Sequence, residues 1–272
     1  MVHLSGGGDE APSVIRELCR EGVFQQSTNG LAKGYAQGNL VLLPPGQDAD
    51  AFAKFCMGNP KPCPLLEVVE SGPYGLVDMA KGVDLRTDLP KYLVYRGGKV
   101  VEERTDIKEL WVEENQWVAF VIGCSFSFED AIERAGLSVR HNELGTTVPM
   151  YKTTVDCRES GGYKGKMVMS MRPYKPQDIP KVINITGKFS RVHGAPLHVG
   201  KPKDIGISDL SKPDYGDPPE IRQGEVPVFW GCGVTPQLVL SQCRPNLSYI
   251  THKPGHMLVL DKLNADLARK YG

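Results

Sequence analysis

The chain has 272 residues, of which 40% are hydrophobic and 24% are charged, and its 32 basic residues balance its 32 acidic ones. This composition is typical of a globular protein, and a chain of this length can form one large domain or two modest ones. The zero net charge argues against a nucleic-acid partner. No apolar run approaches the roughly 18–20 residues that a membrane span needs. We therefore expect neither nucleic acid nor a membrane as a partner.

The seven cysteines form no CxxC pair, and their spread along the chain suits free thiols in a reducing compartment. The Gly-rich residues 5–8 lack the apolar core of a signal peptide and the Arg-rich character of a transit peptide. We therefore expect no disulfide, a loose lead-in at the N-terminus and a cytoplasmic location.

Apolar periodicity and turn residues predict strands that alternate with helices. In the first half we expect a helix at 12–20, a strand at 39–43, a helix at 48–58, and strands at 91–96 and 99–103 that form a hairpin around two glycines. In the second half we expect a strand at 117–122, a helix at 127–136, a strand at 166–172, a helix at 178–185, a strand at 226–230, a helix from 235 and a helix at 263–271.

This alternation predicts an α/β protein whose mixed sheet has flanking helices, with a smaller α+β subdomain. We expect one unit over residues 1–272, with the subdomain within about 70–115 and 150–225. The Asp/Pro/Gly-rich residues 201–225 show little regular signal, and a segment of this kind more often lines a site than serves as a linker. Its part around 209–217 is expected to be the wall or lid of a pocket.

Two segments share one pattern, an apolar strand that ends in Gly-Cys and runs into a helix. They are residues 123–127 (GCSFS) and 231–235 (GCGVT), where Ser127 and Thr235 are expected as helix N-caps. Ligands bind at the carboxyl ends of strands in open α/β sheets, so we expect the two turns to lie together. Their backbone N–H groups and helix dipoles would then face an anion. A buried Cys at a strand end can equally be plain packing.

Four of the six histidines lie in two turn-like segments. His193 and His198 belong to VHGAPLHVG, and His252 and His256 belong to THKPGH, where Pro and Gly exclude the HExxH helix of zinc proteases. Histidine is the usual general acid or base near neutral pH, although a lone His is more often an ordinary core or surface group. We expect His252 or His256 to transfer a proton, with His193 and Cys232 beside it.

Several segments together resemble one family. They are YAQGNLVLLP, FCMGNPKPCPLLEV, DLRTDLPKY, IGCSFSFEDAI, VPMYKT, VMSMRP, ITGKFSRVHGAPLHVG, IGISDLSKPDYGD, PVFWGCGVTPQ and THKPGHMLVLD, from Tyr35 to Asp261. The chain is similar over this region to a hydro-lyase family that includes mitochondrial D-glutamate cyclase, which has a further domain. The resemblance implies a hydro-lyase of amino acid metabolism, and it leaves a mitochondrial matrix location open.

The reaction implied by the resemblance is the loss of water from D-glutamate to give 5-oxo-D-proline. The ammonium group must lose protons to a base, and negative charge builds on the oxygens of the attacked carboxylate. No organic cofactor is needed. The substrate, a small amino or dicarboxylic acid, is expected to bind cationic and neutral donors: Arg86, Lys152, Arg172, Ser125, Ser127, Thr235, Asn59 and His198.

Two other functions fit the same residues. One is a metal-dependent hydratase of a small hydroxy acid, with Cys56, Cys124, Cys232 or the histidines as ligands, although the Cys spacing matches no iron–sulfur pattern. The other is a non-catalytic regulatory protein that binds a small acid. We expect no resident metal and leave a homodimer open.

Overall fold

The computed structural model describes residues 10–76, 78–113 and 116–268. Its strands are β1 (Tyr35–Leu43), β2 (Leu65–Val69), β3 (Tyr92–Arg96), β4 (Lys99–Arg104), β5 (Val118–Gly123), β6 (Met150–Asp156), β7 (Lys166–Tyr174), β8 (His198–Val199), β9 (Val226–Gly231), β10 (Tyr249–His252) and β11 (Leu258–Leu263). Its α-helices are α1 (Pro12–Arg20), α2 (Gln47–Gly58), α3 (Phe126–Arg134), α4 (Arg140–Leu144), α5 (Ile179–Gly187), α6 (Thr235–Cys243) and α7 (Asn264–Leu267). No helix in the described part of the chain is long and apolar enough to cross a membrane.

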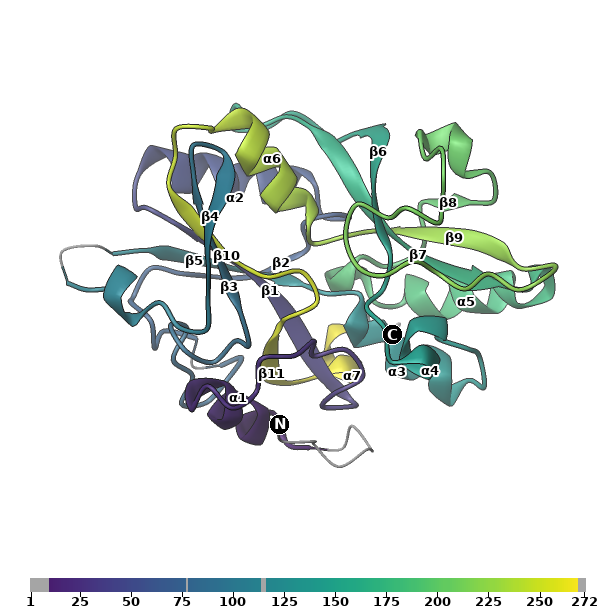
Figure 1. Cartoon of the computed structure of the whole chain (residues 1–272), viewed down its shortest axis with the longest axis horizontal. Helices are drawn as coiled ribbons and strands as arrows, with labels where there is room; N and C mark the ends of the chain where they lie inside the picture. Colours follow the sequence, from purple (N-terminus) through teal and green to yellow (C-terminus); the bar gives the residue numbers. More distant parts are fainter. Residues whose placement is uncertain (1–9, 77, 114–115, 269–272) are drawn as a thin grey trace.

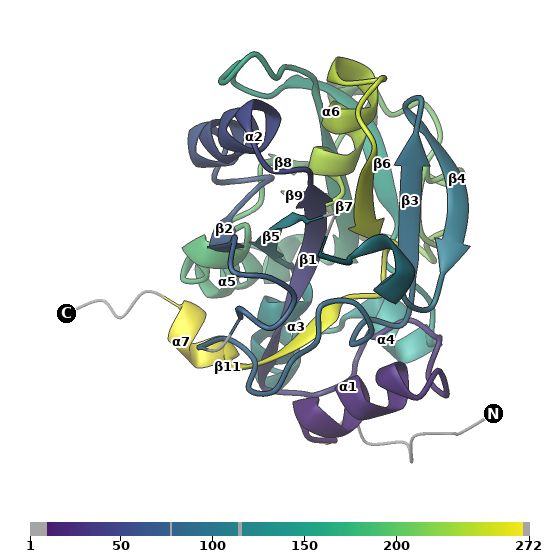
Figure 2. The same cartoon turned by 90° about the vertical axis from the view of Figure 1, so that its left-hand side faces the viewer.

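The strands form two sheets that lie side by side, with helices packed around them (Figure 1). The first sheet has the order β2-β5-β1-β10-β3-β4, with β11 also paired to β1, and the second has the order β6-β7-β9-β8. All pairings between these named strands are antiparallel. The expected α/β class with flanking helices is confirmed. Figure 2 shows α2 and α6 at one end of the molecule and α1 with β11 at the other.

The expected hairpin is present as β3 and β4, and it joins the first sheet. Gly97 and Gly98 have φ values of +61° and +70°, which a tight turn between antiparallel strands requires and which glycine adopts without strain. Residues 150–231 supply the whole second sheet. The division into subdomains stays a prediction.

The end of the chain differs from the expectation. Instead of one helix over 263–271, strand β11 runs to Leu263 and only the short helix α7 follows it. Of the expected range, Leu263 pairs with Tyr35 of β1 and so belongs to the strand, residues 264–267 are helical as expected, and the backbone is already extended at Ala268. Residues 269–271 of the expected helix and the lead-in at 5–8 lie outside the described residues.

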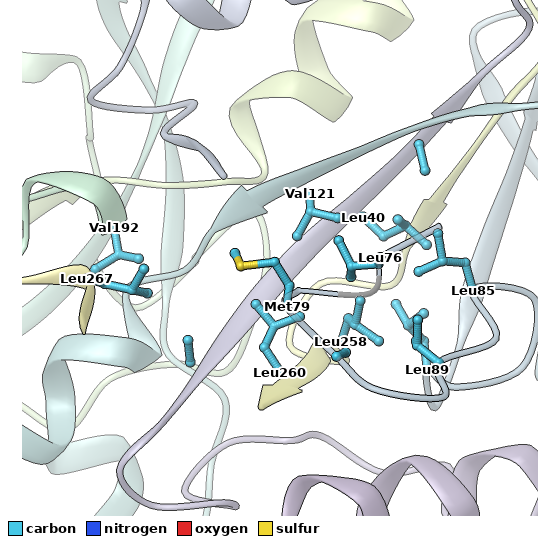
Figure 3. Close-up of a cluster of buried hydrophobic side chains, with 14 of the residues drawn as sticks. Leu40, Leu76, Met79, Leu85, Leu89, Val121, Val192, Leu258, Leu260 and Leu267 are labelled. Carbon is cyan, nitrogen blue, oxygen red and sulfur yellow. The ribbon is translucent and has the colours of Figure 1, made fainter. Parts of the chain in front are cut away.

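Strand β1 is almost completely buried because both of its faces are covered. Side chains alternate along a strand, so Leu40 and Leu42 enter one core while Val41 and Leu43 enter another. The first core is closed by residues 76–89 and by α3 and α5. Figure 3 shows Leu40 and Val121 of its sheet facing Leu76, Met79 and Leu85 of this segment.

The second core lies between the two sheets. Phe120 of β5 and Val41 of β1 share it with Met169 and Met171 of β7, and α2 adds Phe52. The sheets are therefore joined by apolar packing, and the carboxyl ends of β5 and β9 are held in a fixed relation. This relation positions the two Gly-Cys turns.

We predict that Phe120→Ala lowers the free energy of unfolding by about 3–5 kcal/mol, the usual cost of an aromatic-to-alanine cavity. Phe120 is fully buried, and its ring meets the Phe52 ring edge-on at a centroid distance of 4.9 Å. Denaturant unfolding measures the loss, with Val100→Ala on the exposed hairpin as the control. A loss below about 1 kcal/mol, within the range of a surface change, would contradict the assigned packing.

Candidate functional site

The two Gly-Cys turns lie together and share one side chain, Asn39 of β1. Asn39 Nδ2 donates a hydrogen bond to the Gly123 carbonyl at 3.0 Å. On its other side, a Cβ added at Gly233 would lie 2.1 Å from Asn39 Nδ2. The Asn39 amide therefore spans both turns. We call residues 123–127, residues 231–235 and Asn39 the two-turn site.

Glycine is needed in these turns because of space rather than backbone conformation. A Cβ at Gly123 would lie 2.5 Å from the Arg191 carbonyl oxygen, and one at Gly231 would lie 2.9 Å from the Lys61 carbonyl oxygen. Both distances are below van der Waals contact, so a larger residue would push neighbouring chain segments away. Gly123 and Gly231 therefore indicate close packing of other chain segments behind the turns.

A helix starts at each turn. The N-caps of α3 and α6 are Ser125 and Val234, and neither makes a side-chain capping hydrogen bond. The Cys124 sulfur accepts a hydrogen bond from the Phe126 N–H, and the Cys232 sulfur accepts one from the Val234 N–H. Two helix N-termini with the same local geometry therefore meet here, which concentrates positive potential suited to a carboxylate.

The expectation that Ser127 and Thr235 are N-caps is wrong. Both side chains instead satisfy backbone groups of neighbouring strands. Ser127 Oγ accepts the Gln37 N–H at 3.2 Å, and Thr235 Oγ1 accepts the Val168 N–H at 3.0 Å. Each residue is fully buried in the first turn of its helix. Its hydroxyl supplies the hydrogen-bond acceptor that a buried N–H group of the neighbouring strand requires. Neither hydroxyl is therefore free for a ligand.

The two thiols are mostly buried, with 7% of each residue exposed. Burial raises the pKa of Cys232 to about 11 and raises the pKa of Cys124 further, although the backbone N–H groups act in the opposite direction. At neutral pH both are thiols, which can donate weak hydrogen bonds but are poor nucleophiles. This supports Cys232 as an oriented thiol.

Apolar residues surround the thiols and form the thiol cluster: Cys124, Phe126, Val148, Met150, Val168, Cys232, Val234, Leu238 and Met257, with Tyr215 packed against them. Met257 directly follows the THKPGH segment, and Tyr215 belongs to the expected wall at 209–217. The Tyr215 carbonyl accepts the Met150 N–H at 2.9 Å, which fixes this loop over the site. The structure therefore brings both segments to the two turns.

Arg172 of β7 is fully buried and paired with Glu129 of α3. Its Nε donates to Glu129 Oε1 at 3.0 Å, and its terminal nitrogens donate to Ser125 Oγ at 3.0 Å and Ser170 Oγ at 3.1 Å. Burial raises the pKa of Glu129, but the charges and hydrogen bonds of His141 and Arg172 outweigh it and hold the pKa at about 2. The donors of Arg172 are thus engaged by protein groups, and Arg172 fixes the start of α3.

His193 lies behind the turns, 1% exposed, with a left-handed φ of +82° that is unusual for a non-glycine residue. Its Nδ1 lies 2.7 Å from the Lys61 carbonyl oxygen, so this nitrogen carries the proton. Burial lowers the pKa of His193 to about 4, against the effect of that carbonyl. His193 is therefore neutral near pH 7, and it links the backbone behind Gly231 to that of Gly123.

The two histidines of the THKPGH segment differ in their exposure to solvent. His252 is completely buried, its Nδ1 lies 3.1 Å from the Leu40 carbonyl oxygen, and burial lowers its pKa to about 4. His256 is only partly buried, and its Nδ1 lies 3.0 Å from the Pro254 carbonyl oxygen. Burial lowers the pKa of His256 from 6.5, which leaves a neutral Nε2 able to accept a proton.

Four expected binding residues have other partners. Arg86 Nε donates to Asp84 at 2.9 Å, Asn59 Nδ2 donates to the Phe55 carbonyl at 2.9 Å, and His198 Nε2 lies 2.9 Å from the Lys201 carbonyl oxygen. These contacts lie outside the two-turn site. Lys152 lies closer, since its Nζ is 3.5 Å from Asp214 and 5.7 Å from the centre of the Tyr215 ring.

Sequence reasoning missed Asn39, Glu129 and His141. Asn39 is a polar residue directly before the buried apolar run of residues 40–43, and Glu129 lies among the buried residues of α3. Buried polar groups need hydrogen-bond partners, so a polar residue inside an apolar pattern is a signal. His141 could not be identified from the sequence, because its contact with Glu129 at 2.9 Å depends on how α4 packs against α3.

A metal-dependent hydratase would hold its metal ion with several His, Cys, Asp or Glu side chains at one point. Within the described residues, no group of three or more His, Cys, Asp or Glu side chains is arranged to hold a metal ion. The cysteines and histidines of the hydratase alternative do not gather into such a group in the described chain.

Comparison with known proteins identifies relatives along the whole chain. Residues 118–261, just over half of the chain, match the family model described as D-glutamate cyclase. Proteins named "Putative hydro-lyase" from Stutzerimonas stutzeri and Bordetella pertussis are each 50% identical, over 96% and 98% of this chain and 97% and 94% of their own length. One from Geobacillus kaustophilus is 50% identical over 90% of this chain and 92% of its own.

We predict that Glu129→Gln destabilises the protein by about 3–5 kcal/mol, because the Arg172 charge would stay buried without its partner. The folded-state pKa of Glu129 lies below its ordinary 4.5, so its contribution is full above pH 4.5 and is lost as the pH falls toward about 2. Denaturant unfolding from pH 7 to pH 3 measures this. Below pH 4.5 the free energy of unfolding of the wild type should fall toward that of the variant. Glu220→Gln is the control, because its half-exposed carboxylate contributes little, and it should behave like the wild type.

We predict seven titratable thiols in denatured, non-reduced protein, because all seven cysteines are free in the structure. In the native state Cys243 should react first, since it is the only one of the seven that is not buried. Thiol titration with and without denaturant tests both statements. Fewer than seven groups in freshly purified, air-protected protein would contradict the first.

Proposed function

Because the chain belongs to the D-glutamate cyclase family, we propose that it is a hydro-lyase that closes D-glutamate to 5-oxo-D-proline with loss of water at the two-turn site. The observation that carries the proposal is the meeting of two uncapped helix N-termini, each with a thiol, on Asn39. The positive ends of two helices at one point suit a substrate that carries two carboxylates.

In this proposal the substrate binds through the positive electrostatic potential at the two helix N-termini. The positive ends of α3 and α6 attract a carboxylate, and the neutral thiols of Cys124 and Cys232 offer weak donors beside it. Taking a charged carboxylate out of water costs several kcal/mol, and aimed donors offset that cost. Leu238 and Met257 belong to the thiol cluster and Tyr215 packs against it, and we propose that these apolar side chains exclude water and favour a folded substrate.

The chemistry transfers two protons from nitrogen to oxygen. The ammonium group loses a proton, its nitrogen attacks the side-chain carboxylate carbon, and a C–N bond forms. One carboxylate oxygen then leaves as water after gaining both protons that the nitrogen has lost, so charge and atoms balance. Both reacting groups belong to one molecule, so holding the substrate folded supplies much of the rate gain.

His256 is the proposed base, since it is neutral near pH 7 and partly accessible, and it lies one residue before Met257 of the thiol cluster. His252 is completely buried and meets the Leu40 backbone, so a role for it in the reaction would require a path through the protein. We assign Arg172 and His193 as positioning residues, because their contacts fix the two turns.

We predict that His256→Gln lowers turnover of D-glutamate by roughly 10²–10⁴-fold, the range of general acid–base catalysis, without changing the melting temperature. Since the pKa of His256 lies below 6.5, wild-type kcat/KM should hold down to about pH 6.5 and fall at lower pH as the base becomes protonated. Mass spectrometry of a panel of D- and L-amino dicarboxylates reads the loss of water, with His198→Gln as the matched control.

Three results would change the proposal. Binding of D-glutamate or 5-oxoproline with no turnover would indicate the regulatory function instead. Full activity of both His256→Gln and His252→Gln, with loss of activity in Cys232→Ser, would indicate covalent catalysis through Cys232. Turnover of a hydroxy acid that is abolished by a chelator would indicate the metal-dependent hydratase.

A further inference from the structure

A small cavity beside α3 gathers amide oxygens that lack hydrogen-bond partners. It has a volume of about 20 Å³, and Gln37, Asn142 and Asn264 are among the residues that line it. Gln37 Oε1, Asn142 Oδ1 and Asn264 Oδ1 are all buried without a partner, and Gln37 and Asn264 are only 3% and 6% exposed. Buried polar atoms without partners are rare, so three in one cavity indicate a bound species. We call this space the amide cavity.

The orientation of two of these amides is fixed by their own donors. Gln37 Nε2 donates to the Thr28 and Leu31 carbonyls at 3.0 and 3.1 Å. Asn142 Nδ2 donates to Glu133 Oε1 at 2.8 Å and Glu129 Oε2 at 3.3 Å. Rotating either amide would place its oxygen against acceptors, so the unpartnered atom of each amide is the oxygen.

The number of acceptors exceeds what a single water can satisfy. A cavity of this volume holds one small species, and a water molecule has only two donors for three unpartnered oxygens. An ammonium ion has four donors, and a potassium ion of similar size takes several oxygen ligands at once. Neutral amide oxygens without sulfur or imidazole are ligands for hard cations rather than for transition metals.

The charges around the cavity agree with a cation. The lining contains Glu129, Asp130 and Glu133 but a single basic residue, Lys33. Glu129 is balanced by Arg172 on its far side, and Asp130 pairs with Arg134 at 2.9 Å. Glu133 accepts the Asn142 hydrogen bond, which leaves one carboxylate close to the oxygens and limits the site to a single positive charge.

We propose that the amide cavity is a binding site for a monovalent cation of the size of potassium or ammonium. Glu129 lines this cavity and accepts a hydrogen bond from Asn142, and Glu129 also binds Arg172, which donates to Ser125 at the start of α3. A bound cation would fix Asn142 and stiffen this chain of contacts. A cation bound in the amide cavity therefore stabilises the fold and helps to hold the start of α3 in the two-turn site.

The test is thermal unfolding of the full chain in KCl, NH4Cl, NaCl or choline chloride at constant ionic strength. With potassium or ammonium we expect a melting temperature that rises by roughly 3–5 °C for each tenfold increase above half-saturation, and little change with choline. Asn264→Leu removes one oxygen at similar volume and should abolish the rise, while Asn246→Leu on the exposed surface should keep it. Lys33→Gln removes the basic residue and should shift half-saturation to lower concentration.

Crystals of the wild type grown with RbCl provide a second measurement, because rubidium replaces potassium and gives an anomalous signal. A rubidium peak between the three amide oxygens supports the proposal, and a thermal response to ammonium alone assigns the site to that ion. Equal melting temperatures in all four salts, together with no rubidium peak, would overturn it and leave an ordinary bound water. If Asn264→Leu fails to fold, the shift in half-saturation of Lys33→Gln and the rubidium peak in wild-type crystals still test whether the cavity binds a cation.

Discussion

The buried pair of Arg172 and Glu129 is the contact on which the geometry of the site depends. Arg172 comes from the second sheet, Glu129 comes from α3, and Ser125 lies two residues after the end of β5 in the first sheet. Their hydrogen bonds therefore join three elements at one point. A buried ion pair is weak evidence for net stability, because desolvation of two charges offsets their attraction. Its contribution in this protein is the fixed position of the α3 N-terminus.

The rest of the site follows from that fixed position. With α3 held in place, Gly123 can pack against residues 191–193 and accept the hydrogen bond of Asn39. Asn39 in turn lies flat against Gly233, so the second turn can come close only because it has no side chain there. Close packing and polar pairing thus bring two helix N-termini together.

Burial decides which groups of the site can do chemistry. It raises the pKa of Cys232 to about 11 and lowers the pKa of His193 to about 4, so both are neutral near pH 7. A neutral site of this kind favours binding by dipoles and hydrogen bonds over charge pairing. The proposed proton transfer needs a group with more access to solvent, and the partly buried His256 meets that condition.

Much of the fold could be predicted from local sequence. The apolar runs of β1 and β5, the Gly97-Gly98 hairpin and the two Gly-Cys turns are local signals, because each depends on neighbouring residues along the chain. The proximity of the two turns could also be expected from their shared pattern. Asn39 and Glu129 could have been noticed as polar residues in apolar surroundings, but their partners could not.

Only the tertiary structure decided the remaining features. Ser127 and Thr235 have the sequence context of N-caps, yet strand backbones across the core take their hydroxyls, because buried N–H groups must be paired. Arg172 resembles a ligand clamp in sequence, and only the fold shows Glu129 against it. The sequence by itself determined many of the helices and strands, the glycine turns and the family. The tertiary structure determined which polar groups are paired and which are left to bind, because pairing depends on residues distant along the chain.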